Sequence, residues 1–265
     1  MFQEATDFRE ESEALYVILK DLDDNALRTP TLFKGWTFDD VLGHLHFWNR
    51  AAVMSVEDEA TLVALLGRAA SEIPTGGLRG FEDQQLDHIH GKELREAWRD
   101  GFLATAERLG SADPKKRVKW AGPPMSVRSS VTARLMETWA HGQAIYDALG
   151  LMREDTDRIK GIAFLGINTF VWTFANRGLE VPNPPPLVRL EAPSGKIWEW
   201  NGPNDVDSIT GSAAEFCQVV TQTRNIADTQ LLLVGETAKR WMEIAQCFAG
   251  PPTAPPRRGD RFVSR

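Results

Sequence analysis

The sequence predicts an α+β protein that is mainly α: a helical bundle followed by a small α/β unit. Two observations support this class. Apolar residues recur at helical spacing through the first 150 residues, and strand-like segments with turn signals occur only after a proline-rich connector at residues 182–186. We therefore expect a helical bundle over residues 1–150, an α/β C-terminal domain over residues 151–252 and a flexible tail over residues 253–265.

Four segments of the first half have a helical pattern. The first covers residues 2–22. The second begins after Thr37, a good N-cap residue, with Asp39 and Asp40 at the positive end of the helix dipole. It extends to residue 54, and residues 57–70 continue the helical pattern up to a predicted break at residues 73–77. Residues 92–109 and 126–149 are the third and fourth helices, and Gly150 is the residue that ends the last one.

The second half mixes helices and strands. Residues 155–177 have the pattern of one helix. Residues 187–191 and 196–200 alternate like strands on either side of a Pro-Ser-Gly turn, which predicts a hairpin. A third short strand is expected at residues 208–210, and helices at residues 212–223 and 236–248.

Composition excludes several classes of function. The chain has 265 residues, a formal net charge of −7 and a pI of about 5.4, so it repels phosphate backbones and we expect no nucleic-acid partner. Its two cysteines are too few for a disulfide framework, and we expect a cytoplasmic protein. There is no signal-peptide core and no apolar run of the ~20 residues that cross a bilayer, so we expect no membrane partner.

Two histidines lie close together on the second predicted helix. His44 and His46 are two residues apart and point about 200° apart around the helix, so they cannot bind one metal ion together. The pattern places His44 beside Val41 and Trp48, at the edge of the apolar face, and His46 on the polar side. Of the two, His44 is therefore the histidine that we expect to point inward and to form part of a site. The alternative is a hydrogen-bonded core histidine without a ligand.

Glu137 and His141 share one face of the fourth helix because they are four residues apart. With His44 they supply two imidazoles and one carboxylate, which is the ligand set of catalytic zinc sites and also of some Fe(II) sites. The alternative is an exposed pair that contributes only a few tenths of a kcal/mol. Small side chains beside the pair leave room for a pocket: Ser130, Ala133, Ala144 and Ala148.

Other candidate residues have a structural interpretation. His88 and His90 precede the third helix, where we expect a solvated helix entry, with metal chelation as the alternative. Trp48 and Trp139 are expected to pack in the core, with a place in the pocket wall as the alternative. Both cysteines, at positions 217 and 247, are expected to be buried and unreactive.

Two segments resemble the mycothiol-dependent maleylpyruvate isomerase family, which is DinB-like. Residues 35–45 (GWTFDDVLGHL) resemble its W-[ST]-x₂-D-[VL]-x₂-H-[LI] signature, and residues 134–141 (RLMETWAH) resemble its R-x₂-E-x₃-H segment. The resemblance covers residues 1–150, where an uncharacterised actinobacterial branch of metal-binding proteins is most similar. The remaining residues are similar to the family's sterol-carrier-like second domain in element order only.

The resemblance implies a DinB-like four-helix bundle that binds a divalent metal ion, usually zinc, through His44, Glu137 and His141, and not through His46. It also implies that a low-molecular-weight thiol of the mycothiol type is used. One position departs from the family pattern. The family often has an Asp three residues after the second metal-binding histidine, where this chain has Ala144, so we expect one carboxylate beside the site to be absent.

Two hypotheses for function follow. The first is a metal- and thiol-dependent enzyme for S-transfer or isomerisation, a transferase or isomerase whose partners are a small-molecule thiol and an electrophile. In it, Arg134 clamps a carboxylate of the thiol or of the substrate; the alternative for Arg134 is a surface ion pair. The second is a non-enzymatic metal- and ligand-binding protein with a structural metal, which a fourth ligand from His88 or His90 would favour. We expect a monomer or a homodimer.

Overall fold

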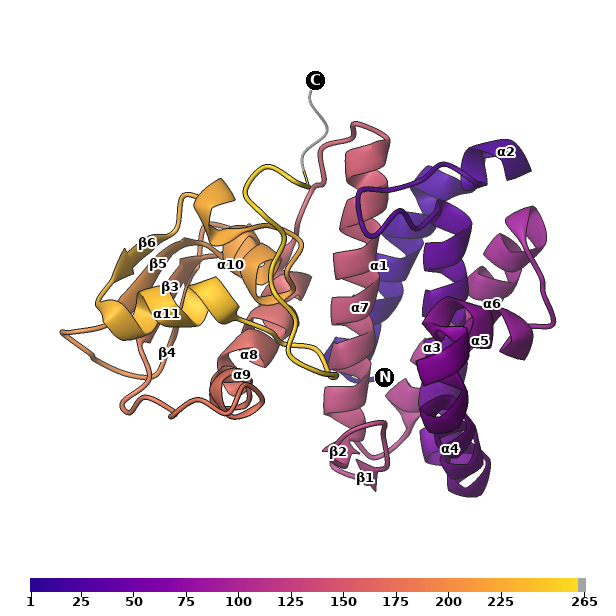
Figure 1. The fold of residues 1–265 in the computed structure, drawn as a ribbon, viewed down its shortest axis with the longest axis horizontal. Helices are drawn as coiled ribbons and strands as arrows, with labels where there is room; N and C mark the ends of the chain where they lie inside the picture. Colours follow the sequence, from indigo (N-terminus) through magenta and orange to yellow (C-terminus); the bar gives the residue numbers. More distant parts are fainter. Residues whose placement is uncertain (262–265) are drawn as a thin grey trace. The chain divides into compact units, whose positions relative to one another are not determined.

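The computed structural model describes residues 1–261 and divides into two compact units, Met1–Ala148 and Leu149–Arg265 (Figure 1). The first unit is mainly helical with one two-stranded sheet, and the second combines helices with a four-stranded sheet. The predicted class, α+β and mainly α, is confirmed. Among the described residues, no helix is both long enough and apolar enough to cross a membrane.

Four helices form the bundle of the first unit in the described part of the chain. Helix α1 packs against α6 and α7, and α3 packs against the same two helices, so the four form a closed bundle (Figure 1). Large side chains fill its centre, and Phe8, Phe38, Trp98, Phe102 and Trp139 are fully buried. The four predicted helices are confirmed, with the bounds α1 (Gln3–Leu19), α3 (Phe38–Glu57), α6 (Gly91–Ser111) and α7 (Val127–Ala148).

Further elements connect the bundle helices, and two of them differ from the prediction. Asp58 separates α4 from α3, because its side chain accepts a hydrogen bond from the backbone N–H of Thr61 and caps the new helix. The break predicted at residues 73–77 is present at its last residue: α4 continues through Pro74 to Gly76, and Gly77 with positive φ separates it from α5. Helix α5 was not predicted. The connecting elements are α2 (Asp24–Leu27), α4 (Glu59–Gly76), α5 (Leu78–Gln85), β1 (Arg117–Val118) and β2 (Met125–Ser126).

The second unit contains one sheet with the strand order β4-β3-β5-β6. The predicted hairpin is confirmed as the antiparallel pair β3–β4, and β5 runs parallel to β3. The edge strand β6 was not predicted; it pairs antiparallel with β5. The elements are η1 (Asp157–Ile159), α8 (Lys160–Asn168), α9 (Phe170–Ala175), β3 (Leu187–Glu191), β4 (Ile197–Trp200), β5 (Ser208–Ser212), α10 (Ala213–Val220), η2 (Ile226–Asp228), β6 (Leu232–Val234) and α11 (Glu236–Ile244).

One expectation for the second unit is wrong, and the start of the expected tail makes hydrogen bonds. The single helix over residues 155–177 is interrupted at Thr169, whose hydroxyl donates to the carbonyls of Leu165 and Gly166 and so competes with the helix hydrogen bonds. The tail is hydrogen bonded in its first part: Arg177 donates to the carbonyl of Thr253 at 2.7 Å, and Asn225 donates to that of Pro256 at 2.8 Å. The first residues of the expected tail are therefore hydrogen bonded to the second unit, and residues 262–265 lie outside the described part.

Candidate metal site

The start of α3 fixes the position of His44. The hydroxyl of Thr37 accepts the backbone N–H of Asp40 at 3.1 Å, and the Asp40 carboxylate accepts the backbone N–H of Thr37 at 2.8 Å. This capping box satisfies two N–H groups that the first helical turn would otherwise leave unpaired, and it confirms Thr37 as the N-cap. His44 lies two turns further along and is buried, with 8% of its surface exposed.

Three side chains nominated by the sequence converge inside the bundle. Glu137 Oε2 lies 3.4 Å from Nε2 of His44 and 3.2 Å from Nε2 of His141. One ligand atom from each of the three residues lies within 4.8 Å of the others, which is close enough for one metal ion. The spacing of four residues on α7 puts Glu137 and His141 on one face, and α3 brings His44 against them.

Aromatic rings from the loop before α3 cover one side of this cluster. The Trp36 ring stacks on the His141 ring with centroids 5.6 Å apart, and it meets His44 edge-on at 5.3 Å. Phe33 also contacts the His141 ring, at 4.9 Å. The loop is closed by a hydrogen bond from the backbone N–H of Thr31 to the carbonyl of Trp36. The histidine rings are therefore held by apolar packing as well as by polar contacts.

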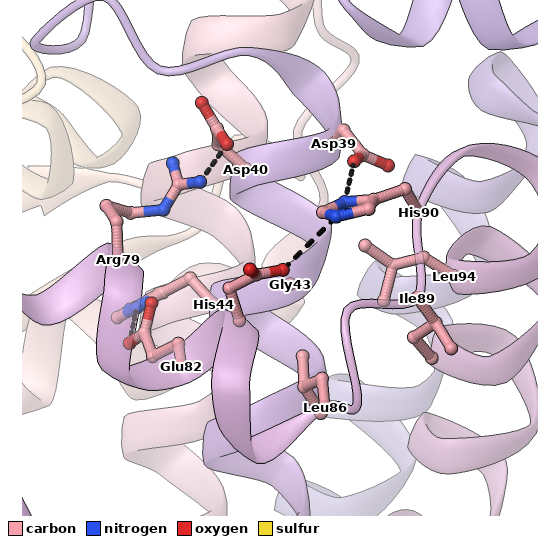
Figure 2. Close-up of a pocket in the computed structure, with 11 residues that line it drawn as sticks. Asp39, Asp40, Gly43, His44, Arg79, Glu82, Leu86, Ile89, His90 and Leu94 are labelled. Carbon is pink, nitrogen blue, oxygen red and sulfur yellow. Dashed lines mark hydrogen bonds and ion pairs between the residues drawn. The ribbon is translucent and has the colours of Figure 1, made fainter.

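A second carboxylate, from Glu82 on α5, contacts the site. Its Oε1 lies 2.7 Å from Nδ1 of His44 and 2.8 Å from Nε1 of Trp48, and its side chain is 2% exposed. Figure 2 shows Glu82 and His44 pointing toward one another from two different helices. The sequence analysis missed Glu82, because α5 was not predicted and the contact with His44 spans 38 residues. A carboxylate beside a site histidine is thus present despite Ala144.

Arg134 is buried in the bundle, with a side-chain exposure of 3%. Its Nη2 lies 3.9 Å from Oε2 of Glu137, and its Nε and Nη1 have no hydrogen-bond partner among the described residues. The alternative of a surface ion pair is therefore wrong. A guanidinium in this position contributes positive charge beside the cluster.

Burial and charged neighbours act in opposite directions on the pKa values of His44 and Glu137. Burial alone lowers the pKa of His44, but the charge of Glu82 and hydrogen bonds with Glu137 and Glu82 raise it to about 9. Burial acts to raise the pKa of Glu137, yet hydrogen bonds with His141 and His44 and the charge of Arg134 hold it well below its usual range. Burial lowers the pKa of His141. The two carboxylates thus favour the protonated form of His44.

The other histidines lie outside the cluster. His46 was expected on a polar side of α3, and this is wrong: it is 8% exposed and packs against Gly101 of α6, where the absence of a side chain leaves room for the ring. Both sides of α3 are covered by neighbouring helices, so no polar face remains at this position. His88 and His90 are exposed and pair with Asp83, as expected for a solvated helix entry.

Two further expectations concern tryptophans and cysteines. Trp139 is a fully buried core residue, as expected. Trp48 is half-buried and donates its indole N–H to Glu82, so it belongs to the surroundings of the site. Cys217 and Cys247 are buried, and burial raises the pKa of the Cys217 thiol well above its usual range, which fits the expected unreactive thiols.

Comparison with known proteins identifies the family of the chain. The family model described as the mycothiol maleylpyruvate isomerase N-terminal domain matches residues 8–146. Uncharacterized proteins from two strains of Mycobacterium tuberculosis are 41% identical over 250 residues, which are 93% of this chain and 95% of each relative.

Two solved structures have a similar fold. They are crystal structures of the mycothiol-dependent maleylpyruvate isomerase and of a mutant with one histidine replaced by alanine, with TM-scores of 0.50 and 0.51. The similarity covers 82% of this chain and 86% of each of those chains at 17% sequence identity, so it supports the fold alone. Because the family model spans more than half of the chain and includes all three converging side chains, the chain belongs to the mycothiol maleylpyruvate isomerase N-terminal domain family.

Proposed function

We propose that the bundle binds one divalent metal ion through His44, Glu137 and His141, and that the protein is a metal-dependent enzyme. It would use a low-molecular-weight thiol of the mycothiol type for isomerisation of, or S-transfer to, a small electrophile. The observation that carries the proposal is the convergence of three ligand atoms within 4.8 Å of one another. The family membership and the name of the structural relatives support the choice of thiol.

The contacts of the cluster fit a cation. A carboxylate can only accept hydrogen bonds, so His44 donates to Glu82 from Nδ1, and a neutral His44 then presents a lone pair at Nε2. That lone pair would face Oε2 of Glu137 at 3.4 Å, so two acceptors would meet unless a proton or a metal ion lies between them. Two imidazole nitrogens and one carboxylate oxygen suit zinc, and the same donors suit Fe(II).

The residues around the cluster fit catalysis with a thiol. A bound divalent metal would lower the pKa of the thiol and hold the thiolate as a nucleophile. Phe33 and Trp36 exclude water from one side of the histidine rings. We propose that Arg134 orients the Glu137 carboxylate. We further propose that a carboxylate of the thiol or of the substrate would reach its Nε and Nη1, which have no hydrogen-bond partner among the described residues.

The second candidate function, a binding protein with a structural metal, requires a closed site with a fourth protein ligand. His88 and His90 were the candidates for that ligand, and their rings pair with Asp83 and Asp39 instead. Three protein ligands are the number that catalytic zinc sites use, so the arrangement favours the enzyme.

The proposal is tested by metal analysis of the purified protein together with a thiol-transfer and isomerisation assay over a panel of small electrophiles. We expect one equivalent of metal per chain and turnover that needs both the metal and mycothiol. Chelator-treated protein is the control and should be inactive until metal is restored. Activity that survives complete removal of the metal would contradict the proposal.

A further inference from the structure

The Glu82 carboxylate is buried, and it accepts two hydrogen bonds on one oxygen. His44 Nδ1 and Trp48 Nε1 both lie within 2.8 Å of Oε1, while Oε2 has no partner among the described residues. A buried carboxylate is costly unless it is paired, so a side chain kept at 2% exposure in this way is held by its donors. The two donors come from α3, whereas Glu82 comes from α5.

Two residues that precede Glu82 hold helix α5 against its surroundings. Three residues before Glu82, Arg79 forms an ion pair with Asp40 at the start of α3 (Figure 2). The Arg79 guanidinium also lies 4.9 Å from the centre of the Trp36 ring. One residue before Glu82, Phe81 packs edge-on against Phe47 with ring centroids 5.8 Å apart. These contacts fix the distance between α5 and α3, and hence the position of the carboxylate relative to His44.

This geometry decides which nitrogen of His44 faces the cluster. A neutral imidazole has one N–H and one lone pair, and donation from Nδ1 to Glu82 leaves the lone pair on Nε2. Nε2 is the atom that faces Glu137. Histidines that bind metals usually donate their other N–H to a carboxylate or carbonyl, which fixes the ring and raises the basicity of the ligand nitrogen.

We infer that Glu82 is a positioning residue for His44: it holds the ring with Nε2 toward Glu137 and His141 and so tightens binding of a divalent metal. Trp48 assists by fixing the accepting oxygen. This inference rests on the proposed metal site. It differs from a purely structural role, in which Glu82 would only anchor α5 to α3 and its loss would change stability alone.

Glu82→Gln tests the inference, because it keeps the shape of the side chain and removes its charge. We expect zinc affinity, measured by competition with a chromophoric chelator, to fall about 10- to 100-fold. In ¹H–¹⁵N NMR spectra of the metal-free and zinc-loaded proteins, we expect the low-field Nδ1–H signal of His44 to move upfield, because an amide oxygen is a weaker acceptor than a carboxylate.

Asp83→Asn is the matched control, since Asp83 is the neighbouring carboxylate on α5 and contacts only the exposed His88 and His90 among the histidines. It should change neither the zinc affinity nor the His44 signal. Trp48→Phe removes the second donor to Oε1 and should weaken zinc binding in the same direction by a smaller factor. It remains informative if Glu82→Gln fails to fold.

The outcomes separate this inference from the proposed function. Unchanged zinc affinity and an unchanged His44 signal in Glu82→Gln, with the wild type binding zinc, would overturn the inference and leave the metal site intact. Wild-type protein that binds no divalent metal would overturn the proposed function. In that case the His44 signal of the metal-free wild type and Glu82→Gln would still decide whether Glu82 positions the ring.

Discussion

Loss of metal binding is the expected result of replacing either histidine of the cluster. Each of His44→Ala and His141→Ala removes one of three ligand atoms, and we expect the affinity for zinc to fall by at least about 100-fold, more than the loss of a supporting residue causes. Metal content after dialysis and a zinc titration would measure this. The bundle should keep its helical circular dichroism, because both residues lie at the site and not among the large apolar side chains of the core.

His46→Ala is the matched control. His46 is as buried as His44 and lies on the same helix, but it packs against Gly101 and its Nδ1 has no hydrogen-bond partner among the described residues. We expect this variant to retain one equivalent of zinc, although it loses packing. Equal loss of zinc in all three variants would contradict the assignment of ligands.

Glu137→Gln is expected to destabilise the metal-free protein as well as to weaken metal retention. Removing the charge leaves Arg134, at 3% exposure, without its nearby carboxylate. Breaking a buried ion pair in this way typically lowers the free energy of unfolding by about 3–5 kcal/mol. Because the Glu137 side chain is 23% exposed, we expect a decrease of about 3 kcal/mol. Urea unfolding of chelator-treated protein gives the free energy of unfolding directly.

Glu96→Gln provides the comparison for this variant. Glu96 also pairs with a buried arginine, Arg95, but its own side chain is 48% exposed. Because water solvates this pair, we expect the free energy of unfolding to fall by less than about 1 kcal/mol. If Glu137→Gln and Glu96→Gln cost the same, the Arg134–Glu137 contact does not stabilise the bundle as the structure implies.

The sequence predicted site residues best where the evidence for them lies within a single helix. The spacing of Glu137 and His141 and the capping residues before His44 depend on local periodicity, which a single chain displays. The same kind of argument failed for His46, because it assumed that α3 has one buried face. In the folded bundle, neighbouring helices cover α3 on more than one side, and only tertiary structure reveals that.

Local sequence patterns could not identify Glu82 as a residue of the site. Its helix α5 has eight residues, begins after a break at Gly77 with positive φ and carries few apolar side chains, so it lacks a long amphipathic repeat. Its contact with His44 depends on the packing of α5 against α3. Strand β6 was missed for a similar reason, since three apolar residues do not display alternation and its pairing with β5 is long-range.

The central claim is that His44, Glu137 and His141 bind a divalent metal ion that a thiol can reach. Cobalt(II) absorption spectroscopy with added mycothiol tests this claim most directly. One equivalent of cobalt should give visible absorption bands in the wild type and not in His141→Ala. Millimolar mycothiol should then add a sulfur-to-cobalt charge-transfer band, since a divalent ion with one carboxylate ligand favours an anionic further ligand. Cobalt binding without any thiol-dependent band would contradict the thiol-dependent function, and absence of cobalt binding in the wild type would contradict the metal site itself.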